Sequence, residues 1–366
     1  MTFAPRLRLA SPRKRYFSSE IERKACDPLR ILFCGSDAFS CASLRALHRE
    51  HEVNRGLVES LDVMVLPPRR TGRGFKEIKE VPCKSVAEHL GLRIHQRETF
   101  RGWSMPEGTN LIVVVSFGLF VPPRILKSAK YGGLNVHPSL LPHLRGPAPI
   151  HHAMMRGDEY TGVSLQTLDP KAFDHGTVLA QTPSPGLPIP GSATLQHVTE
   201  ALAKVGAEML VQGLRDGLHV PPYRDAGWMA EKLHGEDLVH APKVGKRESQ
   251  IDWLEWKSSD FERHVNIFDT IWTHAKNDRG KFKRVLFLDA ESVPVDEVAG
   301  REEEAVFRVE DGSEGRDVPR TVRVDDERDV VYVQTTREGW VRVRSVKVDG
   351  KTAQKARNGL REFLRG

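Results

Sequence analysis

The stretch Leu134-Asn-Val-His-Pro-Ser-Leu-Leu-Pro-His-Leu-Arg-Gly-Pro-Ala-Pro-Ile150 joins a short apolar segment to a run of turn residues, and Asp169-Pro-Lys-Ala-Phe-Asp-His-Gly176 follows it downstream. Asn135 and His137 are two positions apart, so on an extended strand their side chains share one face. With a carboxylate from the later segment, an amide and an imidazole suit the attack of an amine on a carbonyl: Asn holds the oxyanion, His moves a proton and Asp orients the imidazole. An isolated Asn-x-His pair is more often a turn that holds a structural histidine.

The order of residues along this region is more specific than the pair alone. It resembles the folate-dependent formyltransferase family, and the resemblance implies that Asn135, His137 and Asp174 are the catalytic residues. The chain departs from the family pattern at His175, where the family commonly has Thr. The segments that carry the resemblance are Asn135-Val-His137, Ser139-Leu-Leu-Pro142, Arg145-Gly-Pro-Ala-Pro-Ile150, Gly157-Asp158, Thr161-Gly-Val163 and Phe173-Asp-His-Gly176.

The same resemblance implies a formyl donor, 10-formyltetrahydrofolate, as cosubstrate. It places the folate against the turn that ends the apolar run 111–115 and against the segment after His137. No metal is expected to take part. The residues expected to bind the folate are Ser116, Phe117, Gly118, Ser139, Leu140, Leu141 and Pro142.

Hydrophobic patterning predicts an α/β fold for the first part of the chain. Residues 29–36 form an apolar run that closes on Gly, and residues 37–50 have helical spacing, so strand, turn and helix follow in order. The continuous apolar run 111–115 predicts a parallel strand buried on both faces. We therefore expect a Rossmann-like open parallel sheet, the formyltransferase fold. The further glycines of a dinucleotide fingerprint are missing, which excludes NAD binding.

The chain is long enough for two domains. We expect a transit peptide and disordered lead over residues 1–28, a catalytic domain over 29–218, a linker over 219–240 and a carboxy-terminal domain over 241–366. Residues 241–253 resemble the opening of the carboxy-terminal domain in family members that act on methionyl-tRNA. The short alternating segments that follow predict strands, and the resemblance implies a smaller OB-like β-barrel that binds tRNA.

Residues 67–76 are rich in Pro, Gly and Arg, which predicts an exposed cationic loop. Its Gly-Arg-Gly core resembles the loop with which family members that act on tRNA hold the acceptor end. The alternative to tRNA binding is that these basic residues lie on a solvent-exposed loop or strand face and bind nothing. The residues expected to contact tRNA are Arg69, Arg70, Arg73 and Lys76 in the loop and Arg344 and Lys347 near the carboxy terminus.

The formal net charge is +6, and the first 19 residues contribute five basic residues and no acidic one. The remainder therefore carries about +1 (6 minus 5), which gives no argument for nucleic-acid binding from net charge. An Arg-rich, Ser-containing and acid-free opening is typical of a mitochondrial transit peptide, although a disordered basic tail has the same composition. We expect the mitochondrial matrix as the location.

Other classes of protein are disfavoured by simple counts. The apolar run 111–115 is far too short to cross a bilayer, so no membrane partner is expected. The four cysteines, Cys26, Cys34, Cys41 and Cys83, form no CxxC pair and have no ligand-like His grouping nearby, so we expect reduced thiols.

Taken together, the resemblance implies transfer of the formyl group of 10-formyltetrahydrofolate to the α-amine of methionyl initiator tRNA, in support of mitochondrial translation initiation, by a monomer. One alternative is a formyltransferase acting on a free small amine, such as glycinamide ribonucleotide or an amino sugar. The carboxy-terminal domain and the arginine loop disfavour it. A non-catalytic tRNA-binding protein is the other alternative, and the intact Asn, His and Asp disfavour that.

Overall fold

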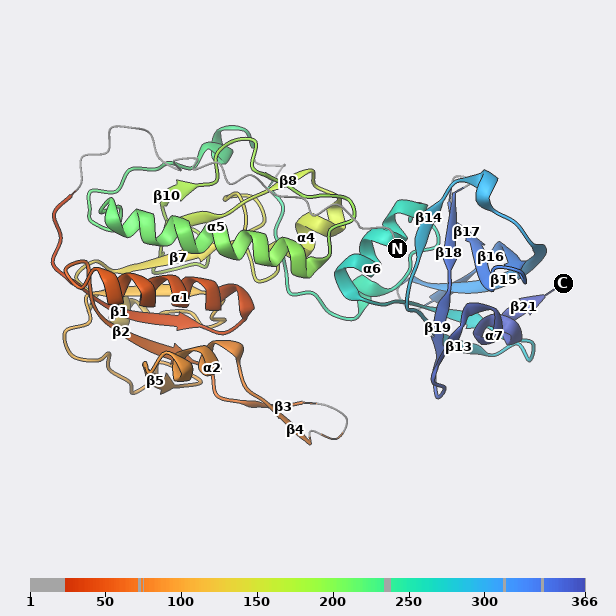
Figure 1. Cartoon of the computed structure of the whole chain (residues 1–366), viewed down its shortest axis with the longest axis horizontal. Coiled ribbons are helices and arrows are strands. Elements are labelled where there is room, and N and C mark those ends of the chain that lie inside the picture. Colours follow the sequence, from red (N-terminus) through yellow and green to blue (C-terminus); the bar gives the residue numbers. More distant parts are fainter. Residues whose placement is uncertain are drawn as a thin grey trace, which may run out of the picture. The chain divides into compact units, whose positions relative to one another are not determined.

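The computed structural model describes residues 24–71, 74, 76–233, 238–311, 314–336 and 339–365 (Figure 1). By their contacts the described residues form two compact units. The first unit comprises residues up to 145, 162–187 and 202–239, and the second comprises 146–161, 188–201 and 240 onward. Helix α4 (Pro149–Arg156) and the beginning of helix α5 (Leu195–Arg215) therefore group with the second unit, although both lie inside the expected catalytic domain.

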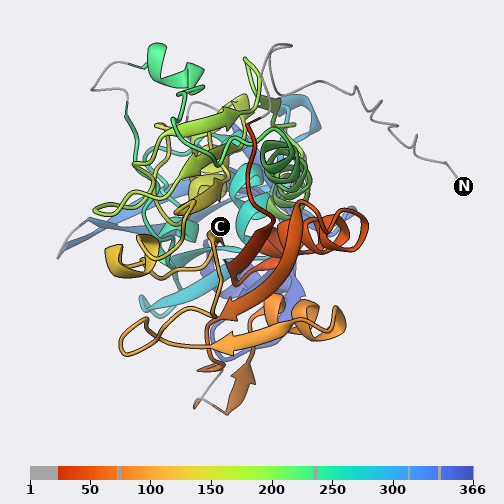
Figure 2. The same ribbon diagram turned by 90° about the vertical axis from the view of Figure 1, so that its left-hand side faces the viewer.

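A seven-stranded sheet forms the centre of the first unit, in the order β10-β9-β7-β6-β1-β2-β5. The strands from β5 to β7 run parallel, which confirms the predicted α/β sheet, and β9 and β10 add an antiparallel edge. Figure 2 shows β1 and β2 side by side from a second direction. The strands are β1 (Leu29–Gly35), β2 (Val58–Val65), β5 (Arg93–Gln96), β6 (Leu111–Val115), β7 (Gly133–His137), β9 (Ser164–Thr167) and β10 (Val178–Gln181).

Local sequence explains how the first strands and helices form. All five residues of β6 are buried, as expected for a strand between β1 and β7 with both faces covered. Helix α1 (Ala38–Val53) begins after Asp37, whose carboxylate accepts a hydrogen bond from Ser40 N at 2.9 Å, as an N-cap residue does. Helix α2 (Pro82–His89) packs on α1, and the short helix α3 (Pro123–Leu126) follows β6.

The predicted cationic loop is a hairpin rather than an irregular loop. Strands β3 (Arg69–Thr71) and β4 (Glu77–Lys79) pair antiparallel, with Arg70 opposite Ile78. Residues 69–71 pair with residues 77–79, which follow the predicted loop. The composition of the loop alone therefore did not indicate that two strands pair here. Arg73 lies outside the described residues.

Residues 219–240, expected to be a linker, pack in their first half on the first unit. Ala226 N donates to Val178 O at 2.7 Å, which attaches the segment to β10. In the 3₁₀ turn 228–231, Trp228 Nε1 donates to Thr182 O at 2.7 Å. This half of the segment is therefore anchored to the edge of the sheet.

The second unit contains helix α6 (Ser258–Phe268) and a ten-stranded antiparallel sheet. Its core includes Trp253, which stacks on Phe307 with ring centroids 4.0 Å apart. A second, β-rich domain is confirmed, and its closure into an OB-like barrel stays a prediction. The strands are β12 (Ile271–Lys276), β13 (Phe282–Phe287), β14 (Glu291–Val293), β15 (Arg301–Asp311), β16 (Glu314–Asp325), β17 (Val330–Gln334), β18 (Trp340–Val343), β19 (Ser345–Val348), β20 (Ala353–Lys355) and β21 (Leu364–Arg365), with helix α7 at Ala356–Leu360.

The described residues were also surveyed for features of other protein classes. None of their helices has both the length and the apolar character needed to span a bilayer. All four cysteines are free thiols. Within the same part of the chain, no three His, Cys, Asp or Glu side chains are grouped as metal ligands would be.

One buried histidine makes the stability of the first unit sensitive to pH. His219 is fully buried and packs edge-on against Tyr131, with ring centroids 5.1 Å apart. Neither ring nitrogen has a hydrogen-bond partner among the described residues. Burial, with the nearby Lys24 acting in the same direction, lowers the pKa of His219 from 6.5 to about 4.

The unfolded chain therefore binds a proton at His219 that the folded chain excludes, so stability present above pH 6.5 is lost as the pH falls toward 4. A shift of this size corresponds to roughly 3 kcal/mol in the free energy of unfolding. Urea titrations across this range should show the loss in the wild type and a flatter profile in His219→Phe. The exposed His197→Asn should keep the wild-type slope, and an unchanged slope in His219→Phe would contradict the assignment.

Candidate active site

The structure brings Asn135, His137 and Asp174 together at the carboxyl end of β7. Asn135 and His137 are on one face of the strand, as predicted, and Asp174 is in the loop between β9 and β10. Asn135 Nδ2 donates to Asp174 Oδ1 at 3.1 Å, and His137 Nδ1 lies 3.4 Å from the same oxygen. The side chains of His137 and Asp174 are only 6% and 9% exposed, so this polar cluster is largely shielded from water.

The backbone fixes which nitrogen of His137 can exchange a proton. His137 Nε2 lies 3.0 Å from Leu144 O. A carbonyl oxygen only accepts hydrogen bonds, so Nε2 carries a hydrogen and donates it. Nδ1, which faces the Asp174 carboxylate, is therefore the nitrogen whose proton can move between the two side chains.

Backbone strain is concentrated around this cluster. Five non-glycine residues in the described part of the chain have positive φ, and three of them, Ser116, Leu144 and Asp174, lie at this site with φ of 47°, 57° and 58°. Left-handed backbone at an L-residue other than Gly costs about 1–2 kcal/mol. Such strain persists where the surroundings over-determine it, which is common at functional sites.

The Asp-x-Gly turn after Asp174 depends on Gly176. A Cβ atom at Gly176 would lie 1.7 Å from Thr167 O, so no other residue fits the observed backbone. Thr177 N donates to Thr167 Oγ1 at 2.9 Å and closes the turn onto β9. His175, the departure from the family pattern, is exposed, and its Nδ1 lies 2.5 Å from Phe173 O in its own loop. Its ring is thus held by a backbone oxygen of its own loop.

Two further residues hold Asp174, and the sequence analysis did not single them out. Gln166 lies opposite Asn135 in the β7–β9 pairing, and its Nε2 donates to Asp174 Oδ1 at 3.2 Å. Arg145 Nε donates to Asp174 O at 2.8 Å. Burial lowers the pKa of Arg145, while the negative charge of Asp174 acts in the opposite direction. The available signal for Gln166 was an amide on the alternating apolar and polar residues 163–166, of which 164–166 lie in β9 in the structure.

The segment 139–142, expected to contact folate, is held by a buried hydrogen-bond network. Ser164 Oγ donates to Ser139 O at 2.7 Å and accepts from Leu141 N at 3.0 Å. Gln181 Nε2 donates to Leu141 O at 2.9 Å. Ser139, Leu140 and Leu141 are all buried. The backbone of this segment is therefore fixed by Ser164 and Gln181, and its contact with folate stays a prediction.

The segment 116–118 combines one open residue with two that are engaged in the protein. Phe117 is 2% exposed and packs edge-on against Phe100, with ring centroids 6.2 Å apart. Ser116 hydrogen-bonds Asp37, whose pKa is raised by burial against the opposing effect of this bond. Gly118 is exposed with φ of 82°, and no atom lies within 4 Å of the place a Cβ would take. A ligand can therefore approach the backbone closely at Gly118.

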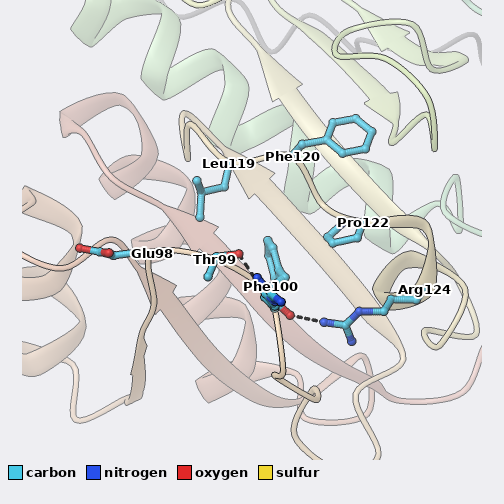
Figure 3. Close-up of a pocket in the computed structure, with 8 residues that line it drawn as sticks. Glu98, Thr99, Phe100, Leu119, Phe120, Pro122 and Arg124 are labelled. Carbon is cyan, nitrogen blue, oxygen red and sulfur yellow. Dashed lines mark hydrogen bonds between the residues drawn. The ribbon is translucent and has the colours of Figure 1, made fainter.

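A pocket with a cavity volume of about 370 Å³ adjoins this segment (Figure 3). Leu119, Phe120 and Phe100 supply apolar wall. Arg124 is fixed there because its Nη1 donates to Trp103 O at 2.9 Å and its Nη2 donates to Phe100 O. Phe120 also packs edge-on against Phe173, the residue before Asp174, at 5.1 Å between ring centroids. The pocket and the polar cluster are thus joined by one aromatic pair.

The candidate tRNA-binding residues differ in how far their charge is already neutralised. Arg69, Arg70 and Lys76 are exposed on the β3–β4 hairpin. In the second unit, Arg344 Nη2 and Arg342 Nη2 lie 2.6 and 2.7 Å from the same atom, Glu291 Oε2. Glu362 is shared by Lys283 at Oε2 and Lys351 at Oε1, and the two lysines lower its pKa to about 2. Lys347 is exposed, and the described residues hold no ion pair to it.

Comparison with known proteins agrees with this fold. Residues 29–214 match the formyl transferase family. A methionyl-tRNA formyltransferase of Cereibacter sphaeroides is 33% identical over 279 residues, which cover 73% of this chain and 84% of that protein. The mitochondrial methionyl-tRNA formyltransferase of Mus musculus is 33% identical over 246 residues, which cover 67% and 58%. The solved structure of WlaRD, a sugar 3N-formyl transferase, shares the fold with a TM-score of 0.51, 11% identity, and coverage of 88% of this chain and 99% of that one.

The chain therefore belongs to the formyl transferase family, and the predicted resemblance is confirmed. Within that family, both its bacterial and its mitochondrial relatives are methionyl-tRNA formyltransferases, in agreement with the predicted kind of enzyme.

Proposed function

We propose that this protein transfers the formyl group of 10-formyltetrahydrofolate to the α-amine of methionine on initiator tRNA, in mitochondria. The observation that carries the proposal is the convergence of Asn135, His137 and Gln166 on one oxygen of Asp174. The names of the relatives supply the substrate class, because they act as methionyl-tRNA formyltransferases in bacteria and mitochondria.

The folate supplies the electrophilic formyl carbon. A bond forms between the amine nitrogen and this carbon while the bond from the carbon to the folate nitrogen breaks. The amine loses one proton and the folate nitrogen gains one. The Asn135 amide has two N–H groups and gives one to Asp174, so the other remains for the negative charge that develops on the formyl oxygen.

Asp174 is the group placed to accept the proton of the attacking amine, directly or through one water. His137 supports it in this proposal, because Nδ1 can share the proton with Asp174 Oδ1 while Nε2 stays bonded to Leu144 O. Enclosure of the two side chains strengthens these interactions relative to those in water.

The chemistry of the residues around the pocket supports a folate site there. The backbone at Gly118 is accessible to a ligand because no atom lies within 4 Å of the place a Cβ would take. Leu119 and Phe120 present an apolar and aromatic surface on which a flat ring can pack. We propose that the folate lies along residues 116–120 and reaches Asp174 past Phe173. The segment 139–142 forms the opposite wall in this proposal.

Parallel assays test the proposed function. Purified protein and 10-formyltetrahydrofolate would be combined with charged initiator tRNA, with free methionine, or with glycinamide ribonucleotide and an amino sugar. We expect formylation of the charged tRNA only. Formylation of a small amine but not the tRNA would support the free-amine alternative, and absence of turnover with every amine would support a non-catalytic tRNA-binding protein.

We also propose import into the mitochondrial matrix, on the composition of residues 1–28, of which residues 1–23 lie outside the described part. The protein recovered from the organelle should begin near residue 18 and not at its initiator methionine. Amino-terminal sequencing of that form would decide the question. Intact Met1 or Thr2 there would refute cleavage.

Arg73 provides the sharpest test of tRNA as the substrate. It is flanked by Gly72 and Gly74, which allow close approach of the backbone, and a guanidinium can bind phosphate or a base edge with paired hydrogen bonds. Arg73→Ala should lower kcat/KM for charged initiator tRNA roughly tenfold, with kcat reduced because a misplaced acceptor end misplaces the amine.

Steady-state kinetics with each substrate in turn would measure the effect of Arg73→Ala. The KM for 10-formyltetrahydrofolate should be unchanged. Arg55→Ala is the matched control, since Arg55 is an exposed arginine in a different loop with 70% of its side chain accessible. If both variants had the same kcat/KM for the tRNA, Arg73 would be no more than a solvated surface residue.

A further inference from the structure

Gln166 is placed differently from an ordinary buried glutamine. It is 1% exposed on β9, directly opposite Asn135 on β7, so both amides lie on the same face of the sheet. Its Nε2 donates to Asp174 Oδ1 at 3.2 Å. Its Oε1 is buried and has no hydrogen-bond partner among the described residues. An unpaired buried carbonyl oxygen costs free energy, so its presence beside a catalytic carboxylate requires an explanation.

The neighbouring Gln181 shows what a purely structural glutamine looks like in this sheet. It is 4% exposed on β10, one strand away. Its Nε2 donates to Leu141 O and to Ser164 Oγ at 2.9 and 2.8 Å, and its Oε1 accepts from Met229 N at 3.1 Å. Every polar atom of Gln181 is thus used to hold the fold. Gln166 holds only the carboxylate, and its acceptor is unused.

A carboxyl group that gains and loses a proton needs different partners in its two states. As a carboxylate it only accepts hydrogen bonds, and as a carboxylic acid it also donates one. A primary amide carries N–H groups on one side and an oxygen on the other. Rotation of a glutamine amide by a half-turn about χ3 therefore exchanges its N–H groups and its oxygen, so that a donor is replaced by an acceptor at the same position. That torsion is broad and roughly two-fold, so both settings are accessible.

We propose that Gln166 is a positioning residue that follows the proton on Asp174. Its N–H holds the carboxylate before the reaction, and its oxygen accepts from the carboxylic acid in the state in which Asp174, rather than His137 Nδ1, carries the proton of the amine. The carboxyl group then keeps its orientation toward His137 Nδ1 in both states. This inference rests on the proposed function, and it assigns Gln166 no contact with either substrate.

Several other groups of the described residues also act on Asp174, among them Asn135, which donates to Oδ1 at 3.1 Å. His137 faces Oδ1 from β7, Arg145 donates to the backbone oxygen of Asp174, and His175 is its neighbour in the loop. A substitution that removes the Gln166 N–H leaves these groups in place. It takes away one hydrogen-bond donor that favours the charged form of Asp174. The acidic limb of the profile of kcat/KM against pH should therefore move to higher pH.

The experiment compares three variants with the wild type over roughly pH 5 to 9. Gln166→Met keeps the length of the side chain without its amide, and Gln166→Glu is nearly isosteric but carries a second carboxylate. Gln181→Met removes the structural glutamine. Each is assayed with 10-formyltetrahydrofolate and charged initiator tRNA, and its Tm is measured by circular dichroism.

We expect Gln166→Met to lower kcat about 10- to 100-fold with both KM values within about twofold, and to move the acidic limb upward by about one pH unit. Gln166→Glu should move the limb further in the same direction, because two adjacent carboxylates resist full ionisation. Gln181→Met should lower Tm and leave the limb in place.

The proposal would be overturned if the acidic limb of Gln166→Met lay at the same pH as in the wild type and its activity fell only in proportion to the loss of folded protein. Gln166 would then be a structural residue. The same result for Gln166→Glu would overturn it if the Met variant did not fold. If the wild type formylated a small amine and not the tRNA, the proposed function would fail, and the same comparison with that amine would still decide the role of Gln166. An enzyme that formylated no amine would overturn both proposals.

Discussion

Asp174→Asn is expected to lower kcat at least a hundredfold while the chain keeps its fold. Asparagine tolerates the positive φ at this position better than most residues and keeps an acceptor oxygen for Asn135 and Gln166. It removes the negative charge beside His137 and, in the proposed mechanism, the group that takes the proton of the amine. General acid-base catalysis contributes a factor of about 10² to 10⁴ in rate. Single-turnover and steady-state formylation of charged initiator tRNA would measure the loss.

Asp169→Asn is the matched control for that measurement. Asp169 lies in the same loop, but its Oδ1 accepts hydrogen bonds from Lys171 N at 2.7 Å and Ala172 N at 2.9 Å, which stabilise the loop and not the catalytic cluster. Its variant should keep nearly the wild-type kcat. If Asp174→Asn were as active as Asp169→Asn, Asp174 would not be the catalytic carboxylate.

The second large effect is expected from Gly176→Ala, and it is an effect on stability. The added methyl group would overlap Thr167 O, a backbone atom that cannot rotate away, so the turn and the end of β9 must move apart. Substitutions that force such a displacement are among the exceptional ones that lower the free energy of unfolding by about 4 kcal/mol or more. This corresponds to a Tm lower by roughly 10 °C. The displaced Asp174 should reduce kcat in the same variant.

Gly191→Ala provides the comparison for Gly176→Ala in thermal unfolding followed by circular dichroism. No atom lies within 4 Å of the place its Cβ would take, so Tm should stay close to that of the wild type. Equal Tm values for the two alanine variants would show that the β9 turn accommodates a side chain, contrary to the observed geometry.

The central sheet could be predicted because its strands differ sharply from their surroundings. The run 111–115 has no polar residue, and such a strand is stable only between two others with helices on both faces, as β6 is between β1 and β7. Asp37 and the apolar spacing after it likewise mark the start of α1. The antiparallel edge formed by β9 and β10 was not predicted, since short strands carry no signal for the direction of their partners.

The polar cluster around Asp174, for which a catalytic role is proposed, was predicted in part for a similar reason. Asn135 and His137 share a face because of the two-residue period of a strand, which is a local property. Gln166 reaches Asp174 because the register of β7 and β9 sets it opposite Asn135, and register is a property of two segments. The tautomer of His137 depends on Leu144 O, whose position follows from a residue with positive φ. Neither could be read from local sequence.

Arg344 was expected to contact tRNA, and its acidic partner in the structure was not anticipated. Glu291 is about fifty residues from Arg342 and Arg344 in sequence, and the pairing of β14 with β18 brings them together. The free positive charge on this part of the second unit is therefore smaller than its number of basic residues suggests.

This sharing of one carboxylate between two cations bears on the thermodynamics of the proposed tRNA complex. A free lysine or arginine that meets a phosphate releases small ions from the nucleic acid, and the slope of log K against log salt counts them. Glu291 and Glu362 already act as built-in counter-ions for their pairs. A phosphate that approached Arg344 would compete with a tethered carboxylate, whose local concentration does not depend on the buffer. The measured salt slope should therefore count fewer basic residues than the interface contains.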